Sequence, residues 1–117
     1  MKKLKSLQAP QILKLDLGCG KNKLQGFHGV DVLKFEGVDT VLDLTERSPL
    51  FKNSADPFKP HGGGFKPWPW SDDSVDEVHS SHFLEHLNSE QRIHFFNELY
   101  RILRKDGKAT IIVPHWR

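Results

Sequence analysis

LKLDLGCG, at residues 13–20, is the most informative stretch of this chain: an apolar strand runs directly into a turn that holds two glycines. Gly18 and Gly20 have no β-carbon, so each can adopt a positive φ value and let a flat or charged ligand approach the main chain. A larger side chain would fill that space. The stretch therefore predicts a ligand site of exposed backbone at the end of the first strand.

Apolar runs alternate along the chain with helical or loop segments, a pattern typical of an α/β fold with a largely parallel sheet. The predicted strands are 12–17, 29–32, 40–44, 75–80 and 109–113. The β-branched composition of the last run suits a strand that is buried on both faces, and Pro114 closes it.

The clearest helix is predicted over residues 90–104. Asn88 or Ser89 can cap its start, and Gly107, after Asp106, marks its end. One apolar stripe recurs at helical spacing and is predicted to pack against the sheet: Ile93, Phe96, Tyr100 and Leu103. A shorter helix is expected to begin near His82.

The composition is that of one globular domain. At 117 residues the chain can build one core but not two, so residues 1–117 are expected to form a single domain. No apolar run approaches the roughly 20 residues that a bilayer span needs, and a net charge of +2 gives no indication of nucleic-acid binding. Cys19, the only cysteine, fits a cytoplasmic location, and its small size between two turn glycines favours packing over nucleophilic chemistry.

Residues 46–73 form the longest predicted loop. Loops of this length tend to be functional or disordered. The glycine run at 62–64 is interpreted as flexible, because no Lys-Ser or Lys-Thr pair follows it as in a phosphate loop. Trp68 and Trp70 lie beside prolines, and we interpret them as packing anchors rather than as a platform for nucleic acid.

Two acidic residues are predicted to lie close to the glycine turn. Asp16 lies at the end of the first predicted strand and Asp31 at the end of the second, where ligands bind in open parallel sheets. A carboxylate at a strand tip can accept hydrogen bonds from both hydroxyls of a ribose. A dinucleotide site would need a third glycine where Lys23 stands and an acid further along, so a nucleoside with a charged amino-acid tail fits better.

Five ordered segments now make the chain resemble the Rossmann-like (class I) S-adenosylmethionine-dependent methyltransferases. They span residues 12–116 and are LDLGCG at 15–20, GVDV at 29–32, LDL at 42–44, PWSDDSVDEV at 69–78 with SSHFLEHL at 80–87, and RILRKDGK at 101–108. The resemblance implies a three-layer α/β sandwich with a mostly parallel sheet in the order 3-2-1-4-5. It also implies S-adenosylmethionine as the cofactor.

The resemblance gives each predicted cofactor-binding residue a role. Those expected at the methionine part are Asp16, Gly18, Cys19 and Gly20; those at the ribose and adenine are Asp31, Val32, Asp43 and Leu44; those beside the sulfonium are Ser81 and His82.

His82 is the candidate general base, should the acceptor have to lose a proton. Glu85 and His86 are the other candidates for the base. Alternatively, His82 and His86 could only cap the local backbone and face solvent. His79, His82 and His86 could chelate a metal ion, but no cysteine or clear carboxylate completes the set, so no metal is expected.

Two departures from the family pattern stand out. Only 11 residues, 18–28, separate the first two strands, so the usual helix there must be short or absent. The sequence also stops directly after the fifth predicted strand, where the family normally adds two more strands. An apolar edge at 111–113 would then need cover from a second copy or a missing segment.

The function implied by the resemblance is transfer of a methyl group from S-adenosylmethionine to an acceptor that the sequence does not identify. The alternative is a non-catalytic module that binds a nucleoside cofactor or a partner. An NAD-linked oxidoreductase is a third interpretation, which the glycine spacing disfavours.

Overall fold

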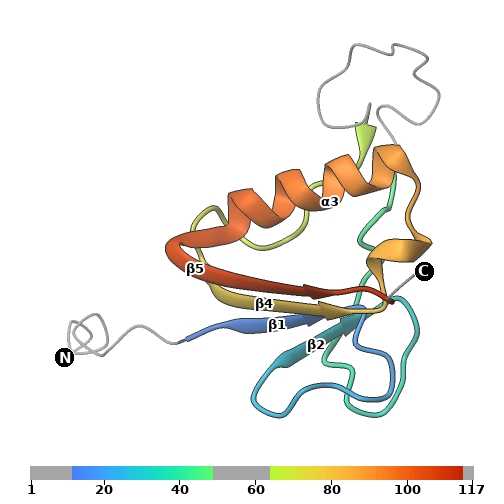
Figure 1. Cartoon of the computed structure of the whole chain (residues 1–117), viewed down its shortest axis with the longest axis vertical. Coiled ribbons are helices and arrows are strands. Elements are labelled where there is room, and N and C mark those ends of the chain that lie inside the picture. The colour runs from blue at the N-terminus through green and yellow to red at the C-terminus, as the bar shows by residue number, and fades with distance from the viewer. Residues whose placement is uncertain (1–11, 49–63, 115–117) are drawn as a thin grey trace.

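One sheet carries five strands in residues 12–48 and 64–114, the parts of the chain that the computed structural model describes. The strands are β1 (Lys14–Leu17), β2 (His28–Asp31), β3 (Thr40–Val41), β4 (Val75–Ser81) and β5 (Leu103–Ile112). All pair in parallel, in the order β3-β2-β1-β4-β5 (Figure 1). The α/β class, the parallel sheet and the strand order expected from the sequence are confirmed.

The strand order reverses at β1, which pairs with β2 on one side and with β4 on the other. Leu15 lies opposite His28 in β2 and opposite Val78 in β4. The chain therefore leaves β1 at Gly18 in the crevice between two neighbouring strands. Open parallel sheets bind their ligands at this kind of crevice.

Helix α3 (Ser89–Ile102) covers one face of the sheet (Figure 1). Asn88 caps its start: the Asn88 side chain accepts a hydrogen bond from the Gln91 backbone N–H at 2.8 Å, and the Gln91 side chain accepts one from the Asn88 N–H at 2.9 Å. This reciprocal capping box satisfies two amide donors that the first turn would otherwise leave unpaired. The predicted cap and the position of the helix are confirmed.

The predicted inner face of this helix is wrong. Ile93, Phe96 and Tyr100 are 53%, 45% and 87% exposed. The residues buried against the core are instead His94, Phe95, Leu99 and Ile102. Both sets recur at helical spacing, so apolar periodicity alone could not choose between them. Ring contacts decide it, because Phe95 packs edge to face on Trp68 with ring centroids 5.5 Å apart.

The fifth strand begins earlier than predicted and is not buried on both faces. Helix α3 ends at Ile102, β5 follows at once, and Gly107 lies within an irregularity of β5 rather than at the helix end. Val75 pairs with Leu103, but Glu77 pairs with Lys108, so several extra β5 residues bulge between these two pairs. Ala109, Ile112 and Val113 are exposed, and β5 is an edge strand within the described residues.

Loops, not helices, connect the first three strands. Residues 18–27 and 32–39 contain no helix and lie on the side of the sheet away from α3 in Figure 1. The prediction of a short or absent helix after β1 is confirmed. The short helix expected near His82 is the 3₁₀ turn η2 (Leu84–His86). No helix in the described ranges is long and apolar enough to cross a bilayer.

The long predicted loop is closed at its base. Arg47 and Phe65 form an isolated antiparallel bridge, and the Lys66 N–H donates to the Glu46 carbonyl at 2.7 Å. Residues 49–63 lie outside the described residues, and so does most of the predicted flexible glycine run at 62–64.

Candidate functional site

A cavity of about 410 Å³ opens at the carboxyl ends of β1, β2 and β4. It is lined by Gly18, Asp31, Val32, Leu42, Asp43, Leu44, Thr45, His82, Phe83, His86 and Leu87. Its size lies within the range of roughly 300–1,000 Å³ typical of small-molecule sites. Two larger hollows border the turn between α3 and β5, at the amino ends of the strands, which is the opposite end of the sheet from the switch point.

Six of the ten predicted cofactor-binding residues line this cavity: Gly18, Asp31, Val32, Asp43, Leu44 and His82. The other four, Asp16, Cys19, Gly20 and Ser81, lie outside its lining. The lining residues come from four separate segments of the chain. The sheet brings them together because the carboxyl ends of parallel strands meet at one edge.

The glycine turn has the conformation that the sequence predicts. Gly18 and Gly20 have φ values of +70° and +59°, and the N–H groups of Gly18 and Cys19 both donate to the Val30 carbonyl, at 2.8 and 3.1 Å. The space beside Gly18 is filled by the ring of Phe83, however, and only Gly20 faces open space. A side chain at position 18 is thus excluded by this protein's own aromatic ring.

Gly18→Ala is expected to lower the free energy of unfolding by about 2 kcal/mol. The left-handed conformation costs a non-glycine residue roughly 1–2 kcal/mol. The added β-carbon would also lie 2.6 Å from Cδ1 of Phe83, so the ring must move. Urea denaturation followed by circular dichroism measures the change, with Gly20→Ala as the control that has the strain without the clash. Equal losses in the two variants would contradict the role given to Phe83.

Asp31 is held at the tip of β2 by two backbone amides. Its Oδ2 accepts from the Gly20 N–H at 2.8 Å and its Oδ1 from the Leu33 N–H at 3.1 Å. Each carboxylate oxygen keeps a further lone pair, so this carboxylate can still accept two hydroxyl groups from a ligand. The glycine turn and the acid thus form one unit at the mouth of the cavity.

The Asp16 side chain makes structural contacts and does not line the cavity. It is 3% exposed, and its Oδ2 accepts from the Leu24 N–H at 3.0 Å while its Oδ1 lies 3.2 Å from Nδ1 of His79. These contacts tie the loop after β1 to both β1 and β4. The sequence offered His79 only as a metal candidate, and no cluster of metal-ligating side chains occurs in residues 12–48 and 64–114.

Cys19 packs beside the backbone of β2: a β-carbon at Gly29 would lie 2.9 Å from its Sγ. Burial raises the pKa of the Cys19 thiol, and the nearby carboxylates of Asp16 and Asp31 raise it further. The neutral thiol therefore predominates at physiological pH, which supports the packing interpretation.

Alkylation of Cys19 is expected to be at least about tenfold slower than that of free cysteine at pH 7.5, because the thiolate is the reacting species. Because the pKa of Cys19 is raised, the rate of alkylation should increase only when the pH rises above the ordinary thiol range. Iodoacetamide labelling followed by mass spectrometry from pH 7 to pH 10 measures it. Labelling as fast as that of free cysteine at pH 7.5 would contradict this.

His82 follows β4 directly and has a left-handed conformation, with a φ of +57°. Its N–H donates to the Ile112 carbonyl at 2.7 Å, and its Nδ1 lies 3.1 Å from Oγ of Ser81. Backbone and ring are therefore both held, and the residue lines the cavity. His86 lines the same cavity, and its Nε2 lies 3.8 Å from Oε2 of Glu85. Non-glycine residues with positive φ are uncommon and cluster at functional sites.

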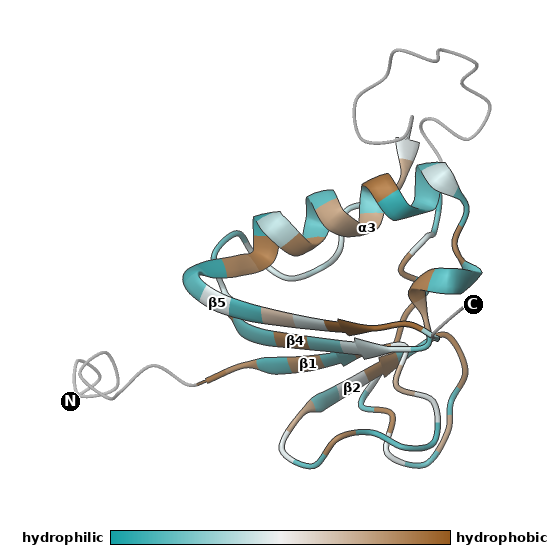
Figure 2. Ribbon diagram, in the orientation of Figure 1, coloured by the Kyte–Doolittle hydropathy of each residue, from teal (hydrophilic) through white to brown (hydrophobic). Residues whose placement is uncertain are grey.

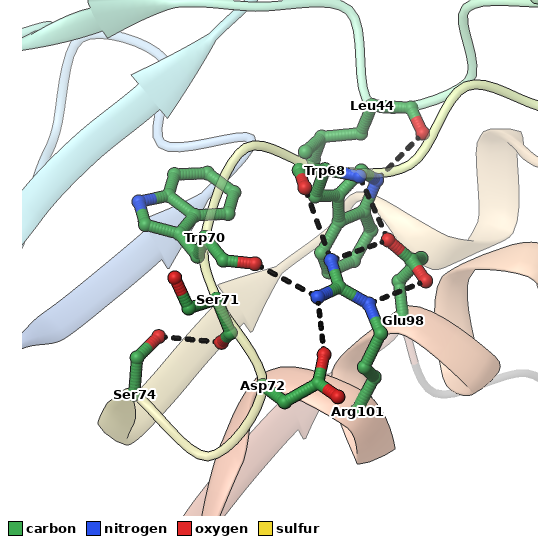
Figure 3. Close-up of polar contacts among 8 residues, drawn as sticks. All are labelled: Leu44, Trp68, Trp70, Ser71, Asp72, Ser74, Glu98 and Arg101. Carbon is green, nitrogen blue, oxygen red and sulfur yellow. Dashed lines mark hydrogen bonds and ion pairs between the residues drawn. The ribbon is translucent and has the colours of Figure 1, made fainter.

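A buried hydrogen bond supports the cavity wall from behind. The indole N–H of Trp68 donates to the Leu44 carbonyl at 2.9 Å, and the Trp68 backbone N–H donates to Oε1 of Glu98 at 2.7 Å (Figure 3). Trp68 is 4% exposed and belongs to the core, so it is the packing anchor predicted from the sequence. Its link to the cavity through Leu44 was not predicted.

Arg101 is the centre of this support (Figure 3). Its guanidinium donates to both carboxylate oxygens of Glu98, at 2.8 and 2.9 Å, to Asp72 at 2.8 Å, and to the carbonyls of Trp68 and Trp70 at 3.0 and 2.9 Å. Hydrogen bonds to Glu98 keep the pKa of Arg101 above its ordinary value despite burial. Burial works to raise the pKa of Glu98, but hydrogen bonds from Arg101 and from the Trp68 N–H outweigh it and hold that pKa low.

Two signals in the sequence could have indicated this network. Glu98 and Arg101 are three residues apart, the spacing at which helical side chains meet. The Pro-Trp-Pro-Trp segment at 67–70 cannot join a regular ladder, because proline has no N–H to donate. Its carbonyl groups therefore need donors from elsewhere in the protein.

Comparison with known proteins gives one match. A family model described as "Methyltransferase domain" matches residues 15–111, which include all the lining residues of the cavity. No curated protein and no solved structure matches the chain.

Proposed function

The chain belongs to the methyltransferase domain family, and we propose that it transfers a methyl group from S-adenosylmethionine to an acceptor. One observation carries the choice of cofactor: Asp31 stands at the tip of β2, joined to the Gly20 N–H, at the mouth of a cavity placed where the strand order reverses. A carboxylate in this position suits the two hydroxyls of a ribose.

The donors and walls of the cavity fit such a cofactor. Asp31 supplies acceptors for ribose hydroxyls, and Val32 and Leu44 offer apolar contacts for a flat base. Gly20 lies outside the cavity lining, but no atom fills the space beside its α-carbon, so a polar tail can approach the chain there. When bound, S-adenosylmethionine supplies an activated methyl group on its sulfonium. The protein then has to orient the acceptor and keep water away, which is where positioning contributes most.

His82 is the residue proposed to take a proton from the acceptor where the acceptor must lose one. The contact with Ser81 fixes the side of the ring that carries Nδ1. His82 itself lines the cavity. We assign Ser81 to positioning His82 rather than to direct contact with the cofactor. A cytoplasmic location, in keeping with the single cysteine, is part of the same proposal.

Calorimetric titration with S-adenosylmethionine, S-adenosylhomocysteine and NAD tests the cofactor. Saturable binding of the first two, without NAD binding, is expected. An assay with labelled methyl groups across small-molecule, protein and RNA acceptors then tests transfer. Binding without transfer to any acceptor would favour the alternative, a non-catalytic cofactor-binding module, and preference for NAD would overturn both.

A further inference from the structure

One phenyl ring belongs to the described lining of the candidate cavity, and it is the side chain of Phe83. Phe83 lies between β4 and η2, in a segment where hydrophobic and hydrophilic residues follow one another along the ribbon of Figure 2. The ring stands beside the glycine turn, because a β-carbon at Gly18 would lie 2.6 Å from its Cδ1. It also packs against Phe95, which is 1% exposed, with ring centroids 5.9 Å apart. The core therefore holds this ring at the edge of the cavity, next to the turn.

The charged side chains of the cavity lining are acidic. Asp31 and Asp43 contribute two carboxylates, and in the part of the chain that the structure describes the lining contains no lysine or arginine. His82 and His86 are its other titratable residues. Oδ1 of Asp43 accepts hydrogen bonds from the N–H and the hydroxyl of Thr45, both at 2.9 Å, and neither donor is charged. A cleft lined by one sign of charge attracts ligands of the opposite sign, so this cavity favours a cation.

An aromatic ring in such a cavity selects one kind of cation. The face of a phenyl ring attracts a positive charge that lies within about 6 Å of its centre, and the attraction grows when the cation has lost its water. A sulfonium group resembles a quaternary ammonium group in having no N–H or O–H to donate. An aromatic ring therefore suits it better than a hydrogen-bond acceptor does.

We propose that Phe83 determines cofactor specificity: its ring attracts the sulfonium charge, so that the cavity holds S-adenosylmethionine more tightly than S-adenosylhomocysteine. This inference rests on the function proposed above. The two ligands share the base, the ribose and the amino-acid tail, and only the first carries a positive charge on sulfur. Asp31 is proposed for the ribose, and its Oδ2 accepts at 2.8 Å from the N–H of Gly20, where the tail approaches. The sulfur connects ribose and tail, so the ring beside Gly18 lies next to their junction.

This preference for the charged ligand also favours turnover. In methyl transfer the bond between sulfur and the methyl carbon breaks, a bond forms between that carbon and a lone pair of the acceptor, and the electron pair of the broken bond stays on sulfur. The sulfur thereby loses its charge, and Phe83 loses the group that it attracts. The product is then held less tightly than the donor that replaces it.

Isothermal titration calorimetry with both ligands tests the role of the ring. An attraction of this kind changes an affinity by roughly 2- to 30-fold. Phe83→Leu and Phe83→Met each keep an apolar side chain but remove the ring, and each should lower the ratio of the two affinities about fivefold. Phe83→Tyr keeps the ring and should retain the wild-type ratio within about twofold. The titrations are run at pH 8, where an ordinary histidine is neutral.

Leu42→Ala is the matched control, since Leu42 is an apolar residue of the same lining and has no ring. A structural role weakens both ligands alike, so Leu42→Ala should change the ratio by less than about twofold. The wild type gives a second measurement that does not depend on the folding of any variant. Raising the salt from about 50 mM to about 500 mM should weaken S-adenosylmethionine about twofold more than S-adenosylhomocysteine, because salt screens the attraction between the sulfonium charge and the acidic lining.

An unchanged ratio in Phe83→Leu and Phe83→Met would overturn this inference, while binding of both ligands would still support the proposed cofactor. A ratio that falls as far in Leu42→Ala, or equal salt dependence of the two ligands, would overturn it as well. If neither ligand binds the wild type, the proposed function itself is wrong.

Discussion

Arg101→Met is expected to lower the free energy of unfolding by about 3 kcal/mol, the low end for breaking a largely buried ion pair. The Glu98 side chain is only 12% exposed and would lose both of its guanidinium partners. The carbonyl groups of Trp68 and Trp70 would lose their donors as well. Methionine keeps the length of the apolar stem, so the loss reports the hydrogen bonds rather than a cavity.

Urea denaturation followed by tryptophan fluorescence measures this loss, because Trp68 and Trp70 lie in the network itself. Arg92→Met is the matched control: Arg92 is exposed on the same helix, and its replacement should cost less than about 0.5 kcal/mol. Adding Glu98→Gln to Arg101→Met should restore part of the stability by removing the unpaired charge. An Arg101→Met variant as stable as Arg92→Met would show that the network contributes nothing.

The same pair predicts how stability depends on pH. The pKa of Glu98 is held below its ordinary value in the folded protein. Its contribution is therefore fully present above the unfolded pKa of about 4.3 and is lost as the pH falls through the folded value. Wild-type stability should fall between about pH 5 and pH 3, and the fall should be shallower in Arg101→Met. Parallel curves for the two proteins would contradict the coupling.

The strand order was predictable because it follows from a local pattern. The LDLGCG turn and the acid after the second strand identify a family whose members share one sheet topology, and the sheet conforms to it. The inner face of α3 was not predictable from the pattern, because a helix with two apolar stripes offers two equivalent choices. Contacts between distant segments, above all Phe95 with Trp68, decide between them.

The candidate site also has features that the sequence predicted and features that it did not. Positions adjacent to strand ends, such as Asp31 and His82, line the cavity as their place in the sequence suggests, because strand ends meet at the edge of a parallel sheet. The contact of Phe83 with Gly18 and the hydrogen bond from Trp68 to Leu44 were not predicted, since they depend on which backbone atom lies beside each ring. Asp16 has the predicted position at the end of β1, but its carboxylate is occupied by Leu24 and His79. Sequence patterns predict where a residue lies better than they predict which way its side chain turns.

Asp31→Asn is expected to weaken binding of S-adenosylhomocysteine about 100-fold. Hydrogen bonds to a charged group are each worth roughly 1.5–3 kcal/mol, and 2.7 kcal/mol corresponds to a factor of 100. Asparagine has the same shape, and its amide oxygen can still accept from the Gly20 N–H or the Leu33 N–H, the two donors that hold Asp31. The change therefore removes the acceptor proposed for the ribose while keeping part of the turn. Isothermal titration calorimetry gives the affinities.

Asp39→Asn is the control that makes this measurement specific to the cavity. Asp39 also accepts a backbone hydrogen bond, from the Gly29 N–H at 2.8 Å, but it does not line the cavity. Its replacement should leave the affinity within about twofold even if it costs stability, which thermal unfolding of both variants will show. Equal weakening in the two variants would mean that Asp31 acts through the fold alone. Unchanged binding in Asp31→Asn would show that Asp31 does not bind the ribose at this site.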